Sequence, residues 1–227
     1  MLALERSETD SMNRSIPLLL WMAIVTSASA QTVFELSKEE QRANDLRARF
    51  FLTTSMGPVS PSDVNQFIDR YIDDRLGSSY ISFGSSDISA VGMVGIGVAI
   101  PLSKALHTRI FLEYAGASKT VRLDTDTERF VVNRFAPGVL LDYYFYSSGF
   151  GSVYVEGGAY YGFTSFRNIN ANGPGFKFNL GYAWHRPQTT WDIFIGVDLP
   201  STKAEQNFYE LKKIDLTAPL FGFRINF

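Results

Sequence analysis

Strict alternation between apolar and other side chains recurs in one segment of this chain after another, and this feature limits the possible folds most. Successive side chains of a β-strand point to opposite faces of the sheet, so a period of two indicates strand. Eight segments fit this period, of which the first is the weakest: residues 50–57, 90–100, 108–117, 134–145, 153–163, 176–185, 190–199 and 220–227. The chain is therefore predicted to be all-β.

The connections between these segments alternate in length. Short turns are expected at residues 101–107, 147–151 and 186–189, and longer loops at 58–88, 119–129, 167–174 and 201–212. An even number of antiparallel strands with short turns at one end and long loops at the other is the plan of a transmembrane β-barrel. We therefore predict an antiparallel up-and-down barrel of about eight strands over residues 50–227.

The less apolar face of these strands carries ionised groups beside glycine and alanine. In a narrow barrel this face would line the lumen, where charges have to pair because they are desolvated. The predicted lumen charge network consists of Arg109, Glu113, Arg134, Asp142, Glu156, Lys177, His185, Asp192, Asp198 and Arg224. A structural role is expected for it, with a gated or leaky polar path as the alternative.

The N-terminal part is typical of an exported protein. Residues 1–30 are predicted to be a leader and cleavable signal peptide, with the true start at Met12, an apolar stretch at 16–25 and cleavage after Ala30. The apolar stretch is about half the roughly 20 residues that a membrane-spanning helix needs. Residues 31–49 are rich in charged helix formers, and we expect a short polar helix there on the periplasmic side.

The first long loop contains a second helical pattern, over residues 61–76. Its apolar positions recur at helical spacing and share one face: Val64, Phe67, Ile68, Tyr71, Ile72 and Leu76. The expected role is packing on the barrel rim or on the rest of its own loop. A lid over the lumen and a contact for an external partner are the functional alternatives.

The closing segment LFGFRINF ends in an aromatic residue and has apolar residues at every second position before it: Phe221, Phe223, Ile225 and Phe227. With the strand pattern, this motif resembles the small eight-stranded bacterial outer-membrane barrels of the OmpA and OmpX kind. The resemblance implies a location in the cell outer membrane, contact with outer-membrane lipid, and recognition of the C-terminal motif by the barrel-assembly machinery. Ile225 and Pro219 depart from the family pattern and leave the register of the upper strand open.

A soluble periplasmic lipocalin-like barrel has the same alternation with its apolar face turned inward. Three features favour the membrane barrel: the export signal, the ending of the chain within a strand, and the ionised groups on the polar face. Trp184 and Trp191 also flank one short turn, where an interfacial aromatic girdle belongs.

No motif of a catalytic, phosphate-binding or zinc site is present, and cysteine is absent. His185 and Asp192 lie across a turn but lack a suitably spaced nucleophile. Asp124, Asp126 and Glu128 form an acidic loop without the spacing of a calcium-binding loop. We expect no enzyme activity, cofactor or metal, and a net charge of -2 does not favour nucleic-acid binding.

A structural or surface-interaction role in the outer membrane is therefore the leading functional hypothesis. A narrow channel or carrier for a small solute is the alternative, and a lipid-modifying enzyme is a weaker one.

Overall fold

The computed structural model of the chain describes residues 47–76, 87–122, 127–148, 150–186, 188–204, 211 and 213–227. Strands dominate these residues, and one α-helix follows the first strand. In chain order the elements are β1 (Arg49–Pro58), α3 (Ser62–Leu76), β2 (Ala90–Pro101), β3 (Leu106–Arg122), β4 (Thr127–Ser147), β5 (Gly151–Phe166), β6 (Ile169–His185), β7 (Thr190–Pro200), β8 (Lys203–Ala204) and β9 (Ala218–Asn226).

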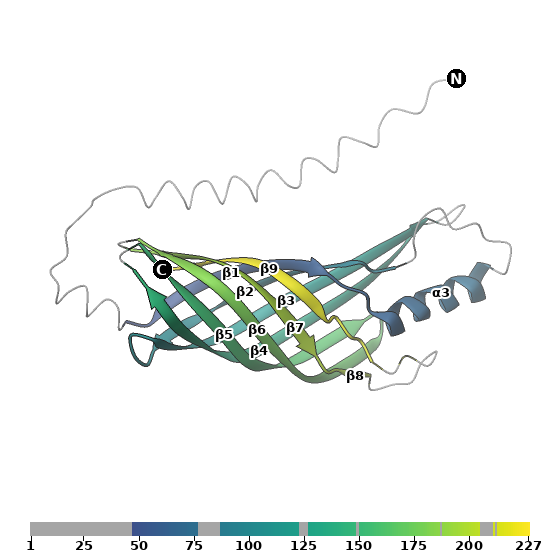
Figure 1. Cartoon of the computed structure of the whole chain (residues 1–227). Coiled ribbons are helices and arrows are strands. Elements are labelled where there is room, and N and C mark those ends of the chain that lie inside the picture. The colour runs from purple at the N-terminus through teal and green to yellow at the C-terminus, as the bar shows by residue number, and fades with distance from the viewer. Residues whose placement is uncertain are drawn as a thin grey trace, which may run out of the picture. The chain divides into compact units, whose positions relative to one another are not determined.

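The eight long strands form a closed antiparallel barrel. β1 pairs with β2 on one side and with β9 on the other, and the remaining strands pair with their neighbours in chain order (Figure 1). The two-residue strand β8 pairs only with the far end of β6. Because the sheet closes on itself, the backbone groups of every long strand find partners on both sides, as a bilayer requires. The predicted eight-stranded up-and-down barrel is confirmed.

The two ends of the barrel differ. Short turns join β2 to β3, β4 to β5 and β6 to β7 at the end where Phe227 lies, and α3 lies at the opposite end (Figure 1). Short turns face the periplasm in outer-membrane barrels, so we refer to the periplasmic end and the extracellular end. The predicted leader at 1–30 and nearly all of the predicted polar helix at 31–49 lie outside the described residues. Arg49 already belongs to β1.

Two of the predicted long loops are mostly strand, and this part of the prediction is wrong. At residues 119–129, β3 continues to Arg122 and β4 begins at Thr127. At residues 167–174, a two-residue turn joins β5 directly to β6. The sheet therefore extends further toward the extracellular end than the sequence pattern indicates.

A belt of large apolar side chains surrounds the middle of the barrel on its outer face. Ile195 of β7 is 58 % exposed, and the pattern repeats around the barrel at Ile110, Val139, Leu180 and Phe221. An apolar surface that continues around a whole protein is incompatible with water and is the lipid-facing surface of a transmembrane barrel. Trp184 and Trp191 are paired across β6 and β7 at the periplasmic border of this belt. No described helix has the length and apolar character to cross a membrane.

Toward the extracellular end, the apolar residues of the strands change from the outward-facing to the inward-facing positions. In β4, Phe130, Val132 and Arg134 all point into the barrel, and Phe135 points out. The inward residues are apolar at 130 and 132 and charged at 134. At the same level the outward side chain is Asn133, which accepts a hydrogen bond from Tyr114 on the outer surface. The interior thus changes from charged to apolar where the outer face leaves the apolar belt.

Inside the barrel, five aromatic rings each lie over a glycine on the neighbouring strand. A methyl group at any of these glycines would overlap atoms of the ring. In every case the ring and the glycine are direct cross-strand partners: Phe51 and Gly97, Phe111 and Gly138, Tyr154 and Gly181, Tyr160 and Gly175, and Phe194 and Gly222. Alternating large and small residues fills the narrow interior of a small barrel without voids.

The closing strand β9 turns its C-terminal motif to the outer face. Phe221 and Phe227 are more than 45 % exposed, and Phe223 and Ile225 are partly exposed between them. The backbone N–H of Phe227 donates a hydrogen bond to the carbonyl oxygen of Phe50 (2.8 Å), which extends the seam between β9 and β1. Recognition of this motif by the assembly machinery stays a prediction.

Candidate functional site

The interior nearer the periplasmic end is filled by a mixed group of charges, which we call the basal cluster. It consists of Arg109, Asp142, Glu156, Asp192, Arg224 and Asn226. Arg109 reaches three of its carboxylates, with Nε 2.5 Å from Asp142 Oδ2 and 3.4 Å from Glu156 Oε2, and Nη2 3.6 Å from Asp192 Oδ2. Arg224 contacts Glu156 through Nη2 (2.8 Å) and Asp192 through Nη1 (3.5 Å). Both guanidinium groups lie over the ring of Phe51.

A second group of charges, the middle cluster, lies nearer the extracellular end. It consists of Glu113, Arg134, Tyr160, Lys177 and Asp198, all of them buried. Arg134 forms ion pairs with Asp198 and with Glu113, and Lys177 forms an ion pair with Glu113. Tyr160 links the two sides, because it accepts a hydrogen bond from Arg134 Nη1 (3.0 Å) and donates one to Asp198 Oδ1 (2.6 Å). Arg134 and Lys177 also contact the sulfur of Met93.

His185 lies apart from both clusters. It is exposed at the periplasmic end of β6, where its Nε2 shares a hydrogen bond with Ser152 Oγ (2.7 Å). Asp192, its expected partner, is fully buried and contacts Arg109, Arg224 and Asn226 instead. The register explains the difference, because Asp192 is paired with Ala183 and His185 is two residues further along the same face. The remaining nine residues of the predicted lumen network belong to the two clusters.

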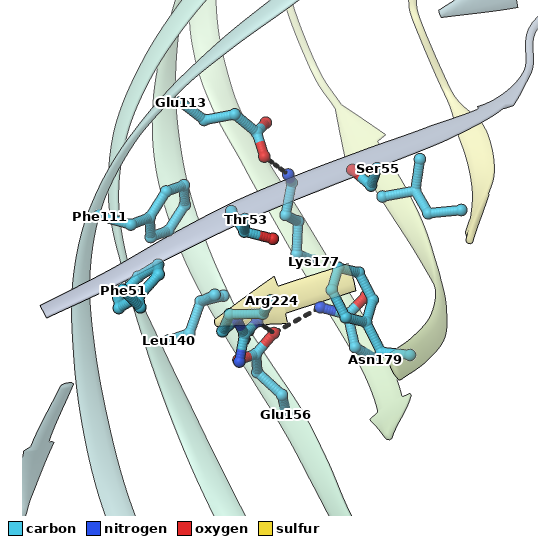
Figure 2. A pocket seen from close by; sticks show the side chains of 12 residues that line it. Phe51, Thr53, Ser55, Phe111, Glu113, Leu140, Glu156, Lys177, Asn179 and Arg224 are labelled. Carbon is cyan, nitrogen blue, oxygen red and sulfur yellow. Dashed lines mark hydrogen bonds and ion pairs between the residues drawn. The ribbon is translucent and has the colours of Figure 1, made fainter. Parts of the chain in front are cut away.

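A small cavity of about 20 Å³ separates the two clusters (Figure 2). Glu113 and Lys177 of the middle cluster line it from one side, and Glu156 and Arg224 of the basal cluster line it from the other. A space of this size holds about one water molecule. Figure 2 shows Asn179 beside it, directed toward Glu156, to which its side-chain amide donates a hydrogen bond (2.5 Å).

Above the middle cluster the interior becomes mainly apolar, and α3 closes it. The inward face of α3 packs with the extracellular parts of the strands in one buried apolar group, which we call the apolar cap. Val64, Phe67, Ile68 and Ile72 of α3 are buried in it, and Tyr71 is partly buried at its edge. The segment before β9 completes the cap with Leu211, Ile214 and Leu216. The helix therefore packs against the inner faces of the strand ends.

Polar contacts on two sides hold α3 in this place. The first is inside: Asn65 Oδ1 accepts a hydrogen bond from the backbone N–H of Ile88 (2.8 Å), just before β2. The second is at the rim: Tyr71 donates a hydrogen bond to Glu128 Oε1 (3.0 Å), and Glu128 forms an ion pair with Arg167. We call Tyr71, Glu128 and Arg167 the clasp.

Arg167 occupies an unusual position in the clasp. It lies in the turn between β5 and β6 with φ at 52°, a conformation that residues other than glycine seldom adopt. Its guanidinium lies 4.2 Å from the ring centre of Tyr71 and 4.6 Å from that of Phe130. Partial burial opposes its charge, but hydrogen bonds to Tyr71 and Glu128 outweigh burial and raise the pKa of Arg167. It stays a cation under all ordinary conditions.

In the sequence, Glu128 stands with Asp124 and Asp126 in an acidic segment that is predicted to be a loop. The structure assigns Glu128 to the clasp, and the two aspartates lie outside the described residues. In the described part of the chain no group of three or more potential ligands from histidine, aspartate and glutamate is close enough to hold a metal ion.

Several site residues have no counterpart in the sequence analysis. Tyr160, Asn179 and Asn226 supply neutral hydrogen bonds to the charged groups, and Arg167 anchors α3. Tyr160, Asn179 and Asn226 share the inward position of the charged residues on their strands, and that position was the available signal. Arg167 gives no such signal, because its role depends on the path of the first long loop.

Comparisons with known proteins add structural resemblances. No protein-family model matches the chain, and no curated protein matches it by sequence. Among solved structures, it is similar to the attachment invasion locus protein Ail of Yersinia pestis (7 % identity, TM-score 0.42, covering 79 % of this chain and 97 % of Ail). It is also similar to the outer-membrane protein OprG of Pseudomonas aeruginosa (12 % identity, TM-score 0.49, covering 79 % of this chain and 96 % of OprG). A third similar structure is the outer-membrane protein AlkL in lipid bilayers (9 % identity, TM-score 0.37, covering 87 % of this chain and 92 % of AlkL).

Proposed function

We propose that this outer-membrane β-barrel is a closed structural protein that conducts no solute and presents a fixed surface at its extracellular end. The observation that carries the proposal is the succession of three layers along the interior. The basal cluster, the middle cluster and the apolar cap follow one another, and the cavity between the two clusters has a volume of about 20 Å³. An eight-stranded barrel is just wide enough for its side chains to fill it, so this interior favours a plug over a pore.

The cap supports a role for the outer surface. α3 is held from inside by Asn65 and at the rim by the clasp, so its outward face is presented in one orientation. That face is polar and exposed, with Gln66, Asp73 and Asp74 among its residues. A rigid polar helix at the mouth of the barrel suits contact with molecules outside the cell better than passage through the lumen.

The first test is electrical. The folded wild-type protein, reconstituted in a planar bilayer, should show no steady conductance above that of the lipid alone, because two ion-paired layers and an apolar layer block the path. A porin in the same bilayer is the positive control. Regular conductance steps from the wild-type chain would favour the channel or carrier instead.

The second test concerns which end faces outward. Because the sequence contains no cysteine, single cysteines can be introduced at Gln66 on α3 and at Ser103 in the turn between β2 and β3, both of which are exposed. A membrane-impermeant maleimide applied to whole cells should label the cysteine at position 66. It should label position 103 only after the outer membrane is permeabilised. The reverse pattern would place α3 in the periplasm and remove the basis for an extracellular surface.

A further inference from the structure

The two charged clusters of the lumen are not balanced alike. In the middle cluster, two cations face two carboxylates: Arg134 and Lys177 against Glu113 and Asp198. In the basal cluster, two cations face three carboxylates: Arg109 and Arg224 against Asp142, Glu156 and Asp192. All of these residues are at most 4 % exposed. A surplus negative charge buried in this way is costly, and a carboxylate relieves the cost by taking up a proton.

The geometry identifies where such a proton would lie. Asp142 and Glu156 are direct cross-strand partners of β4 and β5, and their carboxylates share one partner atom, because Arg109 Nε lies 2.5 Å from Asp142 Oδ2 and 3.4 Å from Glu156 Oε2. Asp142 Oδ1 is buried and no described residue donates a hydrogen bond to it, whereas Glu156 Oε2 lies against Arg224 Nη2 (2.8 Å) and Arg109 Nε (3.4 Å). Two neighbouring carboxylates offer only acceptors, whereas a carboxylic acid beside a carboxylate supplies the missing donor.

We propose that the folded barrel binds one proton in the basal cluster, shared between the carboxyl groups of Asp142 and Glu156. The bound proton makes the basal cluster neutral, like the middle cluster. It also forms a hydrogen bond between the two carboxyl groups, and so between β4 and β5. The site is a proton-binding site inside the barrel and is independent of the proposed role of the extracellular surface.

The third carboxylate of the cluster does not need the proton. Asp192 receives contacts from the side-chain amide of Asn226 on both of its oxygens (3.3 Å each) and lies near both guanidinium groups. The ionisable groups around the pair are Arg109 and His107 of β3, Tyr144 of β4, Tyr154 of β5, Asp192 of β7 and Arg224 of β9. His107 is the cross-strand partner of Asp142, and its ring centre lies 4.7 Å from that of Tyr144. Apart from His107, none of them is a basic group beyond the two arginines already counted.

Infrared spectroscopy of the full chain, folded in lipid vesicles at neutral pH, tests the proposal. The wild-type protein should show a carbonyl stretching band of a protonated carboxyl group, with an amplitude of about one group per chain. The band should shift when the carboxyl groups of aspartate or of glutamate carry carbon-13. Asp142→Asn should abolish it, because the basal cluster is then neutral without a proton. Asp198→Asn, the matched change in the middle cluster, should leave the basal band in place.

The outcomes separate clearly. A folded wild-type protein without the band, or with a band that neither label shifts, would overturn the proposal, as would a band that survives in folded Asp142→Asn. If Asp142→Asn does not fold, Glu156→Gln takes its place with the same expected loss. If neither variant folds, the labelled wild-type protein decides alone: a shifted band supports the shared proton, and its absence removes it.

Discussion

Replacement of Arg134 by methionine should destabilise the folded barrel by about 3–5 kcal/mol, the usual cost of removing one partner of a buried ion pair. Arg134 is 1 % exposed and forms ion pairs with Asp198 and Glu113. Without it, Asp198 keeps the hydrogen bond from Tyr160 but loses its guanidinium partner at a buried position. Urea unfolding in vesicles, followed by heat-modifiable migration on gels, measures the change.

Two further variants show whether charge is the cause. Arg129→Met alters an exposed arginine of the same strand and should change the free energy of unfolding by less than about 0.5 kcal/mol. The double variant Arg134→Met with Asp198→Asn removes both charges and should recover most of the loss, because no carboxylate is left unpaired. A double variant as unstable as the single one would show that Arg134 acts through packing.

Replacement of Ile195 by arginine should impair membrane insertion, with a cost of about 2–4 kcal/mol for a cation on the lipid-facing side near the bilayer midplane. Ile195 lies in the middle of β7 and is 58 % exposed on the outer face. Because the neighbouring positions of the belt are also apolar, the new charge has no polar group nearby to pair with. The folded fraction after refolding into vesicles measures the effect.

The matched control places the same charge on the outer face at a different depth in the membrane. Asn170→Arg places the same charge on the outer face of β6 near the extracellular end, above the apolar belt, and should insert like the wild type. Ile195→Ser, which adds polarity without charge, should lie between the two. Normal insertion of Ile195→Arg would contradict the assignment of the outer face to lipid.

The sequence predicted the barrel because both faces of each strand have distinct tasks within the membrane. Ile195 and Asp198 could be assigned to opposite faces from the period of two alone, and the structure places them so. The nine buried charges of the lumen follow from the same parity. The position of His185 does not follow from it. Parity gives the face on which a residue lies but not its position along the barrel axis, and β6 has reached the periplasmic rim at His185.

The extracellular part was less predictable for a physical reason. Where the strands leave the membrane, the outer face meets water and the inner face meets the apolar cap. The apolar residues of each strand therefore change from the outward-facing to the inward-facing positions. A reversal within β4, between Phe130 and Arg134, looks like the end of a strand in the sequence. The amphipathic pattern of residues 61–76 did indicate the helix, but not that its apolar face would fill the barrel mouth together with Leu211 and Ile214.

The five aromatic rings that lie over glycines have a mechanical consequence. Each pair ties two adjacent strands at a fixed separation, and the pairs occur around most of the circumference, on β1–β2, β3–β4, β5–β6 and β7–β9. Widening the barrel would pull each ring away from the glycine that it contacts and leave a void between them. To narrow the bore, the rings would have to enter backbone that is already in contact with them. The wall should therefore resist the lateral pressure of the bilayer as a stiff tube, and respond to changes in membrane thickness by tilting rather than by changing its diameter.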